Sequence, residues 1–353
     1  MIYTGGIQIT KKEINYVMDA IENGWDGHHE DYKLKFEKEF AKYTASKYAY
    51  STTGGTQALW LSLVALKIGE GDEVILPDLT YFACSDVIKL VGAIPVFVDV
   101  LSSTWCIDPF KFEEAITPRT KAVLPVWLYG NAPEMEEIMA IARKYNLFII
   151  EDACPAVGTR YQGKHSGTFG TTGCFSFHGA KIMTTGFGGM VVTDDKSLYE
   201  RIVFLDDHGE NKKLLYRFWQ EEVGFSFYMH NLNAALGLAQ LERIEEFVTK
   251  KRQIFQWYKS RLKYPMNYEQ TGVRTNKWMT SIIVEDRDNL MKRLKDKGID
   301  TRPFFFPISM FPIYKEVDTP ISHHIGLHGM SLPSGVQRTE EDIDFICKTI
   351  NEN

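Results

Sequence analysis

The sequence predicts an α/β protein with a mostly parallel sheet in a large domain, followed by a smaller α+β domain. Two observations support this prediction. Short apolar runs alternate with helical patterns over the first two thirds of the 353 residues, and strands separated by helices of this length form parallel sheets. After about residue 262 the pattern changes to one strand-like run and two helical patterns. We expect the domains to span residues 1–245 and 246–353.

The first elements have clear boundaries. Thr10 and Glu13 form a capping-box pattern, which predicts a helix that begins beside them. Apolar residues then recur at helical spacing until Gly24 ends the helix. A second, apolar helix is predicted over residues 56–68. Four short apolar runs bounded by turn residues are predicted strands, at residues 73–76, 95–98, 122–126 and 147–150.

A helix is predicted between the last two of these strands, over residues 135–145. Further along the chain we expect a strand at residues 190–193 and a helix near residues 196–204. A long helix follows over residues 231–247 and continues with a bend through residues 250–262. The predicted elements of the last part are a strand at residues 277–284 and helices at residues 287–297 and 339–350.

The composition excludes several classes of protein. A net charge of -6 gives no electrostatic reason to bind nucleic acid or an anionic membrane. The five cysteines show no C-x-x-C spacing, so neither a zinc site nor a disulfide framework is predicted. Reduced thiols fit a cytoplasmic protein. The N-terminal residues lack the pattern of a signal peptide, and no apolar stretch is long enough to span a membrane.

The segment with the most chemical information contains Lys181. This lysine lies among small and apolar residues and precedes a glycine-rich turn at residues 186–189. Burial and nearby positive charge lower a lysine pKa, and the neutral amine can then attack an aldehyde such as that of pyridoxal phosphate (PLP). The alternative is an ordinary solvated lysine in a turn, which is the more common fate of lysine.

Asp152 is a second candidate, because it follows the apolar run at residues 147–150. Ligand sites of open α/β sheets lie at the carboxyl ends of strands. A carboxylate there can keep the pyridine nitrogen of PLP protonated, which makes the ring an electron sink. The alternatives are a helix N-cap or a surface ion pair with Arg160 or Lys164.

Two further segments are suited to a phosphate and to a planar ring. Small residues at positions 51–56 lead into a helix, so backbone N–H groups near Gly55 and the hydroxyl of Thr56 offer an anion site. Tyr81 follows the predicted strand at residues 73–76 and could stack on a cofactor ring. The alternatives are a plain glycine turn with Thr56 as the N-cap, and burial of Tyr81 in the core.

Taken together and in this order, these segments resemble the DegT/DnrJ/EryC1/StrS sugar aminotransferase family of fold-type I (aspartate aminotransferase-like) PLP enzymes. The resemblance covers nearly the whole chain and is strongest to the GDP-perosamine synthases. It is carried by residues 71–77, Glu151-Asp152-Ala153, Phe175-Ser176-Phe177, Lys181, Thr184-Thr185-Gly186, residues 229–235 and Thr301-Arg302-Pro303. A homodimer with shared active sites is implied.

The resemblance also implies a role for each cofactor residue. Lys181 would hold the cofactor through an imine bond and would move protons during catalysis. Asp152 would pair with the pyridine nitrogen, and Tyr81 would stack on the ring. The phosphate would be bound by three residues of one chain and one of the neighbouring subunit, namely Gly55, Thr56 and Ser176, and Asn231.

The implied activity is transfer of an amino group from L-glutamate to a keto-sugar, in surface polysaccharide or deoxyaminosugar biosynthesis. Relatives that dehydrate their substrate have histidine where this chain has Lys181, so lysine favours amino transfer. We expect a nucleotide-linked 4-keto-6-deoxysugar as substrate. A sugar phosphate or a small phosphorylated ketone is an alternative, and so is a regulatory protein that binds PLP without turnover.

The chain departs from the family pattern mainly where the substrate is expected. Residues 26–30 replace a small Ser- or Gly-rich loop, Phe187 replaces a Glu, Tyr228 replaces an Arg, and Ser309 stands where His is common. These departures suggest five candidate substrate contacts, His28, His29, Phe187, Tyr228 and Ser309.

Two departures lie closer to the cofactor. Gly54 replaces an Asn, and Pro155 replaces a Gln or Glu that contacts the phenolic oxygen of PLP, so that hydrogen bond is lost or comes from another residue. No metal site is expected, because the histidine pairs at residues 28–29 and 323–324 lack acidic partners at suitable spacing. The glycines at residues 186–189 lack the spacing of a dinucleotide fingerprint.

Overall fold

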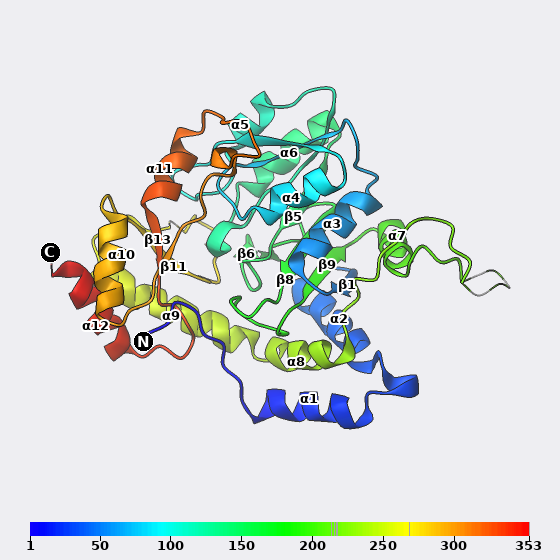
Figure 1. Ribbon diagram of the computed structural model, residues 1–353, viewed down its shortest axis with the longest axis horizontal. Coiled ribbons are helices and arrows are strands. Elements are labelled where there is room, and N and C mark those ends of the chain that lie inside the picture. The colour runs from blue at the N-terminus through cyan, green and yellow to red at the C-terminus, as the bar shows by residue number, and fades with distance from the viewer. Residues whose placement is uncertain (213, 215, 217, 268, 353) are drawn as a thin grey trace.

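The computed structural model describes residues 1–212, 214, 216, 218–267 and 269–352. A seven-stranded sheet forms its centre, with strand order β1-β9-β8-β5-β4-β2-β3 (Figure 1). Its strands are β1 Tyr48–Thr52, β2 Glu73–Pro77, β3 Ile94–Val98, β4 Thr120–Val123, β5 Phe148–Asp152, β8 Thr172–Ser176 and β9 Gly189–Thr193.

The central sheet is mostly parallel, as the sequence predicts. Strands β3, β2, β4, β5 and β8 pair in parallel, and β9 pairs antiparallel to both β8 and β1. The carboxyl ends of the parallel strands therefore lie along one edge of the sheet. Residues that follow these strands in the chain are brought together there.

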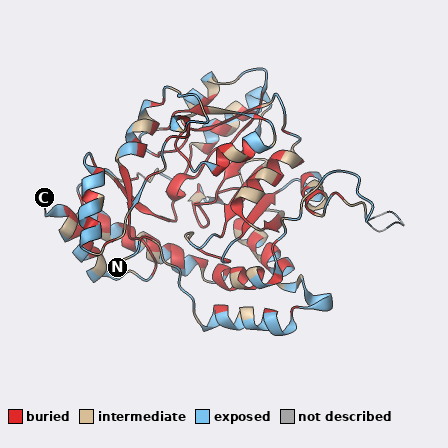
Figure 2. Ribbon diagram, in the orientation of Figure 1, coloured by how far each residue is buried: buried red, intermediate tan, exposed pale blue. Residues whose placement is uncertain are grey.

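The sheet is buried on both faces. Every residue of β2, β8 and β9 is buried, and since successive side chains point to opposite faces, both faces must be covered. Figure 2 shows this buried interior, with exposed residues on the surrounding helices and loops. The surrounding helices are α2 Asp31–Thr44, α3 Gly55–Ala65, α4 Ala83–Leu90, α5 Pro109–Glu114, α6 Met135–Tyr145, α7 Lys196–Asp206 and α8 Asn231–Leu241.

Most predicted elements in this part are confirmed, with small changes in their bounds. The capping box of Thr10 and Glu13 opens α1 Lys11–Asn23. The predicted strand at residues 122–126 ends earlier, at Val123, and Val126 forms only an isolated bridge to Asp152. The predicted long helix is two helices, because the chain bends between α8 and α9 Ile244–Arg261.

The last part of the chain forms a second, antiparallel sheet of order β11-β13-β12. Its elements are β11 Thr280–Ile283, α10 Arg287–Asp296, β12 Arg302–Pro303, α11 Pro320–His328, β13 Gly329–Leu332 and α12 Glu340–Asn351. Ile254, Leu290 and Ile346 belong to a hydrophobic cluster of its own, separate from the main core. The predicted domain boundary, between residues 245 and 246, falls within the first turn of α9 and stays a prediction.

A small third sheet connects the two parts of the chain. Strand β10 Val273–Arg274 pairs with β6 Arg160–Tyr161, which also pairs with β7 Lys164–His165. The segment after β10 is thereby held against the loops that follow β5. This connection brings residues 276–278 to the carboxyl edge of the central sheet.

Helix α1 lies at the outside of the molecule and packs against α8 (Figure 1). Its other face is apolar but exposed, with Ile14, Met18 and Ile21 each more than two fifths accessible. Trp25, just after the helix, is also exposed. Among the described residues there is no helix with the length and apolar composition needed to cross a bilayer.

Candidate active site

Four of the predicted cofactor residues lie at or after the carboxyl ends of β1, β2, β5 and β8. Asp152 is the last residue of β5, and Ser176 is the last residue of β8. Tyr81 follows β2, and Gly55 begins α3 shortly after β1. The strand order thus assembles residues that are up to 121 positions apart in the chain, from Gly55 to Ser176.

Asp152 is buried, and both of its carboxylate oxygens accept hydrogen bonds. Oδ1 accepts from the backbone N–H of Cys154 at 2.9 Å, and Oδ2 accepts from the Cys84 thiol at 3.1 Å. Burial, followed by the charge of Asp152, raises the pKa of Cys84 well above its usual value, so the thiol stays protonated and donates. The proposed surface pairs with Arg160 and Lys164 are not among the ion pairs of the described residues.

Lys181 is half-buried, and its ammonium lies over the indole ring of Trp278, with Nζ 4.2 Å from the ring centroid. Burial raises the pKa values of the Cys84 and Cys154 thiols, and the positive charge of Lys181 makes both increases smaller. These two thiols lie near Asp152. Both observations place Lys181 in the same region as Trp278 and the two thiols, one of which donates to Asp152. It is therefore not the solvated turn lysine that was the alternative.

Gly55 begins α3 in a position that only glycine can occupy. A Cβ there would lie 2.7 Å from Sγ of Cys154 and 2.8 Å from Cβ of Ser176. The first-turn N–H groups of α3 have no intrahelical partners, so the start of this helix, which lies beside Ser176, could bind an anion. Gly54 rather than Thr56 is the N-cap residue, and it caps without a side-chain hydrogen bond.

Tyr81 is not part of the core, because 45% of its surface is exposed. Its ring centroid lies 4.1 Å from that of Phe82 and 5.5 Å from that of Phe305. These contacts hold the ring at the carboxyl edge of the sheet. The interpretation of Tyr81 as a core residue is therefore wrong, and the exposed ring remains available for stacking.

This arrangement fits PLP chemically. The site offers a carboxylate for a ring nitrogen, a lysine for an aldehyde, a helix N-terminus with neighbouring hydroxyls for a phosphate, and an exposed aromatic ring. The close approach of Gly55 to Ser176 makes the phosphate cradle narrow. Among the described residues no group of three or more His, Cys, Asp or Glu side chains could hold a metal ion.

Comparisons with known proteins agree with this chemistry. The profile of the DegT/DnrJ/EryC1/StrS aminotransferase family matches residues 7–351. The chain belongs to this family.

Among curated relatives, the GDP-perosamine synthase of Escherichia coli O157:H7 is 41% identical over 351 residues, which cover 98% of this chain and 96% of the relative. The GDP-perosamine synthase of Caulobacter vibrioides is 38% identical over 359 residues, with coverage of 96% and 95%.

Two solved structures extend the comparison. Spr1654 from Streptococcus pneumoniae in its PLP form has a TM-score of 0.92 at 26% identity and covers 99% of this chain and 97% of that chain. The aminotransferase TlmJ from Streptoalloteichus hindustanus has a TM-score of 0.94 at 27% identity, with coverage of 99% and 98%. The predicted fold, enzyme class and cofactor are confirmed: the chain is a PLP-dependent aminotransferase of the DegT/DnrJ/EryC1/StrS family.

Asn231 is predicted to bind the phosphate of a neighbouring subunit. In this structure its side chain makes its hydrogen bonds within its own chain, to residues at and just before the start of α2. Its Oδ1 accepts from the backbone N–H of Tyr32 at 2.8 Å, and its Nδ2 donates to the carbonyl of His28 at 3.3 Å. Within one chain, the side chain therefore holds the loop between α1 and α2. Its contact with the phosphate of a neighbouring subunit stays a prediction.

The candidate substrate residues lie in different surroundings. His28 and His29 are exposed near the short helix η1 Asp26–His28, where Nδ1 of His28 contacts Asp31. His29 and Tyr228 line the same cavity of about 390 Å³, together with Lys33. The ammonium of Lys33 lies 5.5 Å from the centroid of the Tyr228 ring. These two candidates are thus brought together by the fold.

Phe187 and Ser309 lie elsewhere and differ strongly in exposure. Phe187 is 57% exposed in the glycine-rich turn after Lys181, and its ring packs edge-on against His178. Ser309 is buried, and its hydroxyl and N–H donate to Asp78 at 2.7 and 2.8 Å. Since its polar groups are already used, the position of Ser309 supports a structural role rather than the predicted substrate contact.

Two residues of the site were not predicted from the sequence. Cys84, which donates to Asp152, is one turn beyond Tyr81, so the spacing after β2 could have indicated it. Trp278 lies under Lys181 although the two are far apart in the chain, and its Nε1 donates to the carbonyl of Ala180 at 2.8 Å. No local sequence pattern points to Trp278.

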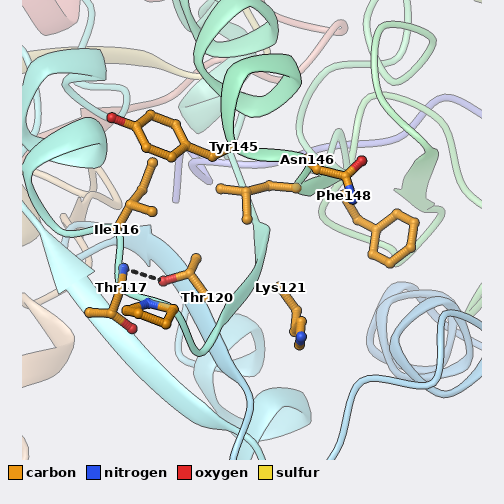
Figure 3. A pocket seen from close by; sticks show the side chains of 9 residues that line it. Ile116, Thr117, Thr120, Lys121, Tyr145, Asn146 and Phe148 are labelled. Atoms are coloured by element: carbon orange, nitrogen blue, oxygen red, sulfur yellow. Dashed lines mark hydrogen bonds between the residues drawn. The ribbon is translucent and has the colours of Figure 1, made fainter.

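One large cavity lies away from this chemistry. It has a volume of about 670 Å³ and is lined by residues 116–118, 120, 121 and 145–148 (Figure 3). Thr120 and Phe148 are the first residues of β4 and β5, so the cavity lies at the amino ends of these strands. The active site lies at their carboxyl ends, and we therefore assign it by its chemistry rather than by cavity size.

Proposed function

We propose that this enzyme transfers the amino group of L-glutamate to the keto group of a nucleotide-linked 4-keto-6-deoxysugar. The observation that supports this most strongly is that Asp152 and Lys181 lie at and after the carboxyl ends of the neighbouring strands β5 and β8, in a chain that is 41% identical to a GDP-perosamine synthase over nearly its whole length. A second curated relative, SpsC of Bacillus subtilis, is named a spore coat polysaccharide biosynthesis protein, which supports a role in polysaccharide synthesis.

PLP would supply the aldehyde that accepts the amino group and the ring that takes up electrons. Lys181 would hold the cofactor, and its amine would then take a proton from the amino donor and return one to the sugar. Asp152 would hold a proton at the ring nitrogen, and Cys84 and the N–H of Cys154 would hold the Asp152 carboxylate in place. The buried position of Asp152 would exclude water from this pair.

The phosphate would be bound by the N-terminus of α3 together with Thr56 and Ser176. Gly55 allows the phosphate to approach the backbone, because a larger residue would collide with Cys154 and Ser176. Tyr81 would cover one face of the cofactor ring. These contacts would orient the cofactor without taking part in proton transfer.

We also propose that the enzyme is a cytoplasmic homodimer with shared active sites. The exposed apolar face of α1, with Ile14, Met18 and Ile21, supports a second copy of the chain as the covering surface. Asn231 lies at the end of α8 next to α1, where a neighbouring subunit would be in reach. Five buried, unpaired cysteines support a reducing compartment.

The experiment combines a cofactor assay with a substrate panel. The protein loaded with PLP is incubated with L-glutamate and with 4-keto-6-deoxysugars linked to GDP or to dTDP, and also with the matching sugar 1-phosphates. We expect equal amounts of 2-oxoglutarate and amino sugar, detected by mass spectrometry, with a nucleotide-linked substrate only. Turnover of the sugar phosphates alone would contradict the substrate assignment, and a PLP absorbance that glutamate leaves unchanged would contradict catalysis.

Sedimentation tests the dimer in the same preparation. We expect twice the mass of one chain, and we expect Met18→Glu on the exposed face of α1 to shift the protein toward monomer. Lys12→Glu on the same helix is not a matched control, because Lys12 pairs with Glu242 of α8. Lys11→Glu is the better control, since Lys11 is exposed. A wild-type protein that sediments as a monomer would contradict the proposal.

A further inference from the structure

We infer that Trp278 is a positioning residue that holds the free ammonium group of Lys181 at the carboxyl edge of the central sheet. The indole ring lies under the ammonium, with Nζ 4.2 Å from the ring centroid. Trp278 comes from the segment before β11, in the last part of the chain, and reaches across to the central sheet. The inference rests on the role proposed for Lys181, and the experiment below separates the two.

Trp278 is held rigidly by its own contacts. Its indole Nε1 donates to the carbonyl of Ala180, the residue before Lys181, at 2.8 Å. Its backbone N–H donates to Oδ1 of Asn276 at 2.9 Å, and its carbonyl accepts from Nζ of Lys251 at 2.9 Å. A residue held by one hydrogen bond at its ring and two at its backbone, and buried to more than nine tenths, can define the position of a flexible lysine side chain.

The segment that carries Trp278 is in turn tied to the site. Nδ2 of the fully buried Asn276 donates to the carbonyls of Pro155 and Val157, both at 2.9 Å. These residues follow Asp152 directly in the chain. The position of Trp278 relative to Asp152 is therefore set by hydrogen bonds to the same loop, and not only by packing.

An aromatic ring face attracts a cation, and the attraction is larger where water is excluded. Lys181 would both hold the cofactor and move protons, and for the second role its free amine would have to stay within reach of the reacting carbon. The ring face of Trp278 would bind the protonated amine while it is not bonded to the cofactor. It would also raise the fraction of protonated Lys181 relative to a site without the ring.

Several other titratable groups lie near Trp278 and Asp152. Lys251, on α9, donates from Nζ to the carbonyl of Trp278 at 2.9 Å. Burial lowers the pKa of Lys251 to about 7, so its charge near neutral pH is partial. The thiols of Cys84 and Cys154 stay protonated because burial raises their pKa values, and His178 is exposed on the same segment as Lys181.

A row of aromatic rings links Trp278 to the other side of the cofactor site. Tyr129 stacks on Trp278 with centroids 5.8 Å apart, and Phe305 stacks on Tyr129 at 5.5 Å with an angle of 9° between the planes. Tyr81 contacts Phe305 at 5.5 Å. Lys181 and Tyr81 thus lie at the two ends of one packed row. The packed row would fix the position of Lys181 relative to Tyr81, the ring that would stack on PLP.

The test uses Trp278→Leu, which removes the ring, and Trp278→Phe, which keeps a ring face but loses the bond to Ala180. The chain offers a matched control in Trp257→Leu, because Lys250 lies over the Trp257 ring at 4.5 Å, outside the active site. Each protein is freed of cofactor and mixed with PLP from pH 6 to pH 10. The rate at which the covalent PLP chromophore forms then reports the fraction of neutral Lys181.

We expect the midpoint of this pH profile to fall by on the order of 0.5 to 1 pH unit in Trp278→Leu, and by less in Trp278→Phe. We expect kcat of Trp278→Leu to fall roughly 10- to 100-fold, because the amine is misplaced. Trp257→Leu should leave both quantities unchanged. A folded Trp278→Leu protein with a wild-type pH profile and wild-type kcat would overturn the inference.

Borohydride treatment of the PLP-loaded wild type distinguishes failure of this inference from failure of the proposed function. Reduction should fix a pyridoxyl group on the peptide that contains Lys181. If that peptide stays unmodified, the assignment of Lys181 itself is wrong. If Trp278→Leu fails to fold, Trp278→Phe decides the question, since a ring of smaller area should still shift the midpoint in the same direction.

Discussion

The two halves of the active site differ in how the chain builds them. The residues expected to bind PLP lie at or near the ends of buried, paired strands, where Cys84 donates a hydrogen bond to Asp152. The residues expected to meet the sugar are dispersed. His29 and Tyr228 share a cavity, Phe187 is exposed in a turn, and Ser309 is buried against Asp78.

This difference indicates that most residues expected to bind PLP are positioned by the strands of the central sheet, whereas most of those expected to meet the sugar lie on loops and turns. Strand ends are held by the hydrogen bonds of the whole sheet, so they tolerate little change. Loops and turns at the surface are held by few contacts and can differ between relatives. Variants of the two halves should therefore differ in the size and the kind of their effects.

The largest effect is expected for Lys181→Ala. Loss of the amine removes both the attachment of the cofactor and the proton transfer, so we expect turnover to fall by ~10⁴-fold or more. PLP should still bind without a covalent bond, because the phosphate cradle and Asp152 remain. Lys196→Ala, which alters an exposed lysine that pairs with Glu200, is the control. Wild-type turnover by Lys181→Ala would show that the site is assigned to the wrong lysine.

Asp152→Asn should have the next largest effect. The amide cannot keep the ring nitrogen protonated, so we expect kcat to fall by roughly 10²- to 10³-fold. Cys84→Ser keeps a hydrogen-bond donor for Oδ2 and should lower kcat only slightly, whereas Cys84→Ala should lower it further. Steady-state kinetics with a common substrate checks the order of the three variants. An Asp152→Asn enzyme that is as active as Cys84→Ser would break the comparison between the halves.

The buried His165 should make the free energy of unfolding depend on pH. Burial lowers the pKa of His165 from 6.5 to about 4, and its Nε2 accepts a hydrogen bond from the N–H of Gly158 at 2.9 Å. Because the pKa is lower in the folded state, this contribution is fully present above about pH 6.5 and is lost as pH falls through 4. It amounts to about 3 kcal/mol of unfolding free energy.

Urea unfolding at several pH values between 7.5 and 4 measures this loss. The variant His165→Gln keeps an acceptor but cannot titrate, so the difference in unfolding free energy between wild type and variant should shrink as pH falls. Since all other titrating groups are shared, the difference reports His165 alone. A constant difference across this range would mean that His165 is not the group responsible.

The smallest effect is expected where the two halves meet, at Gly54 and Phe187. A Cβ on Gly54 would lie 2.9 Å from Cε1 of Phe187 and 2.5 Å from Oε1 of Gln57. We expect Gly54→Asn alone to weaken PLP binding by about tenfold, which is about 1.4 kcal/mol. Combining it with Phe187→Glu should restore much of the affinity, because the ring no longer blocks the new side chain.

Fluorescence titration of the cofactor-free proteins with PLP measures this coupling. Phe187→Glu alone should leave the affinity for PLP within a few fold of wild type but should raise KM for the sugar. Strictly additive effects of the two substitutions would show that Gly54 and Phe187 act independently. The departures from the family pattern at these two positions would then have separate causes.

Much of the fold and half of the site could be predicted from the sequence, because they depend on local patterns. The helix bounds follow from capping residues and apolar spacing, as at Thr10 and Glu13. A polar residue at the end of an apolar strand makes Asp152 a candidate, and small neighbours make Lys181 one, but each pattern alone also fits an ordinary residue. Only the order of several such segments along the chain, which resembles the family, favours the cofactor roles.

The sequence by itself determined the chemistry of this aminotransferase: a lysine, a carboxylate and a phosphate cradle in an α/β chain of the DegT/DnrJ/EryC1/StrS family. Only the tertiary structure decided which distant residues support them. Trp278 meets Lys181 across 97 positions of the chain, counting from 181 to 278, and Ser309 is bound to Asp78. The physical reason is that strand order and the pairing of β10 with β6 place these residues together. No local sequence pattern predicts the strand order or this pairing.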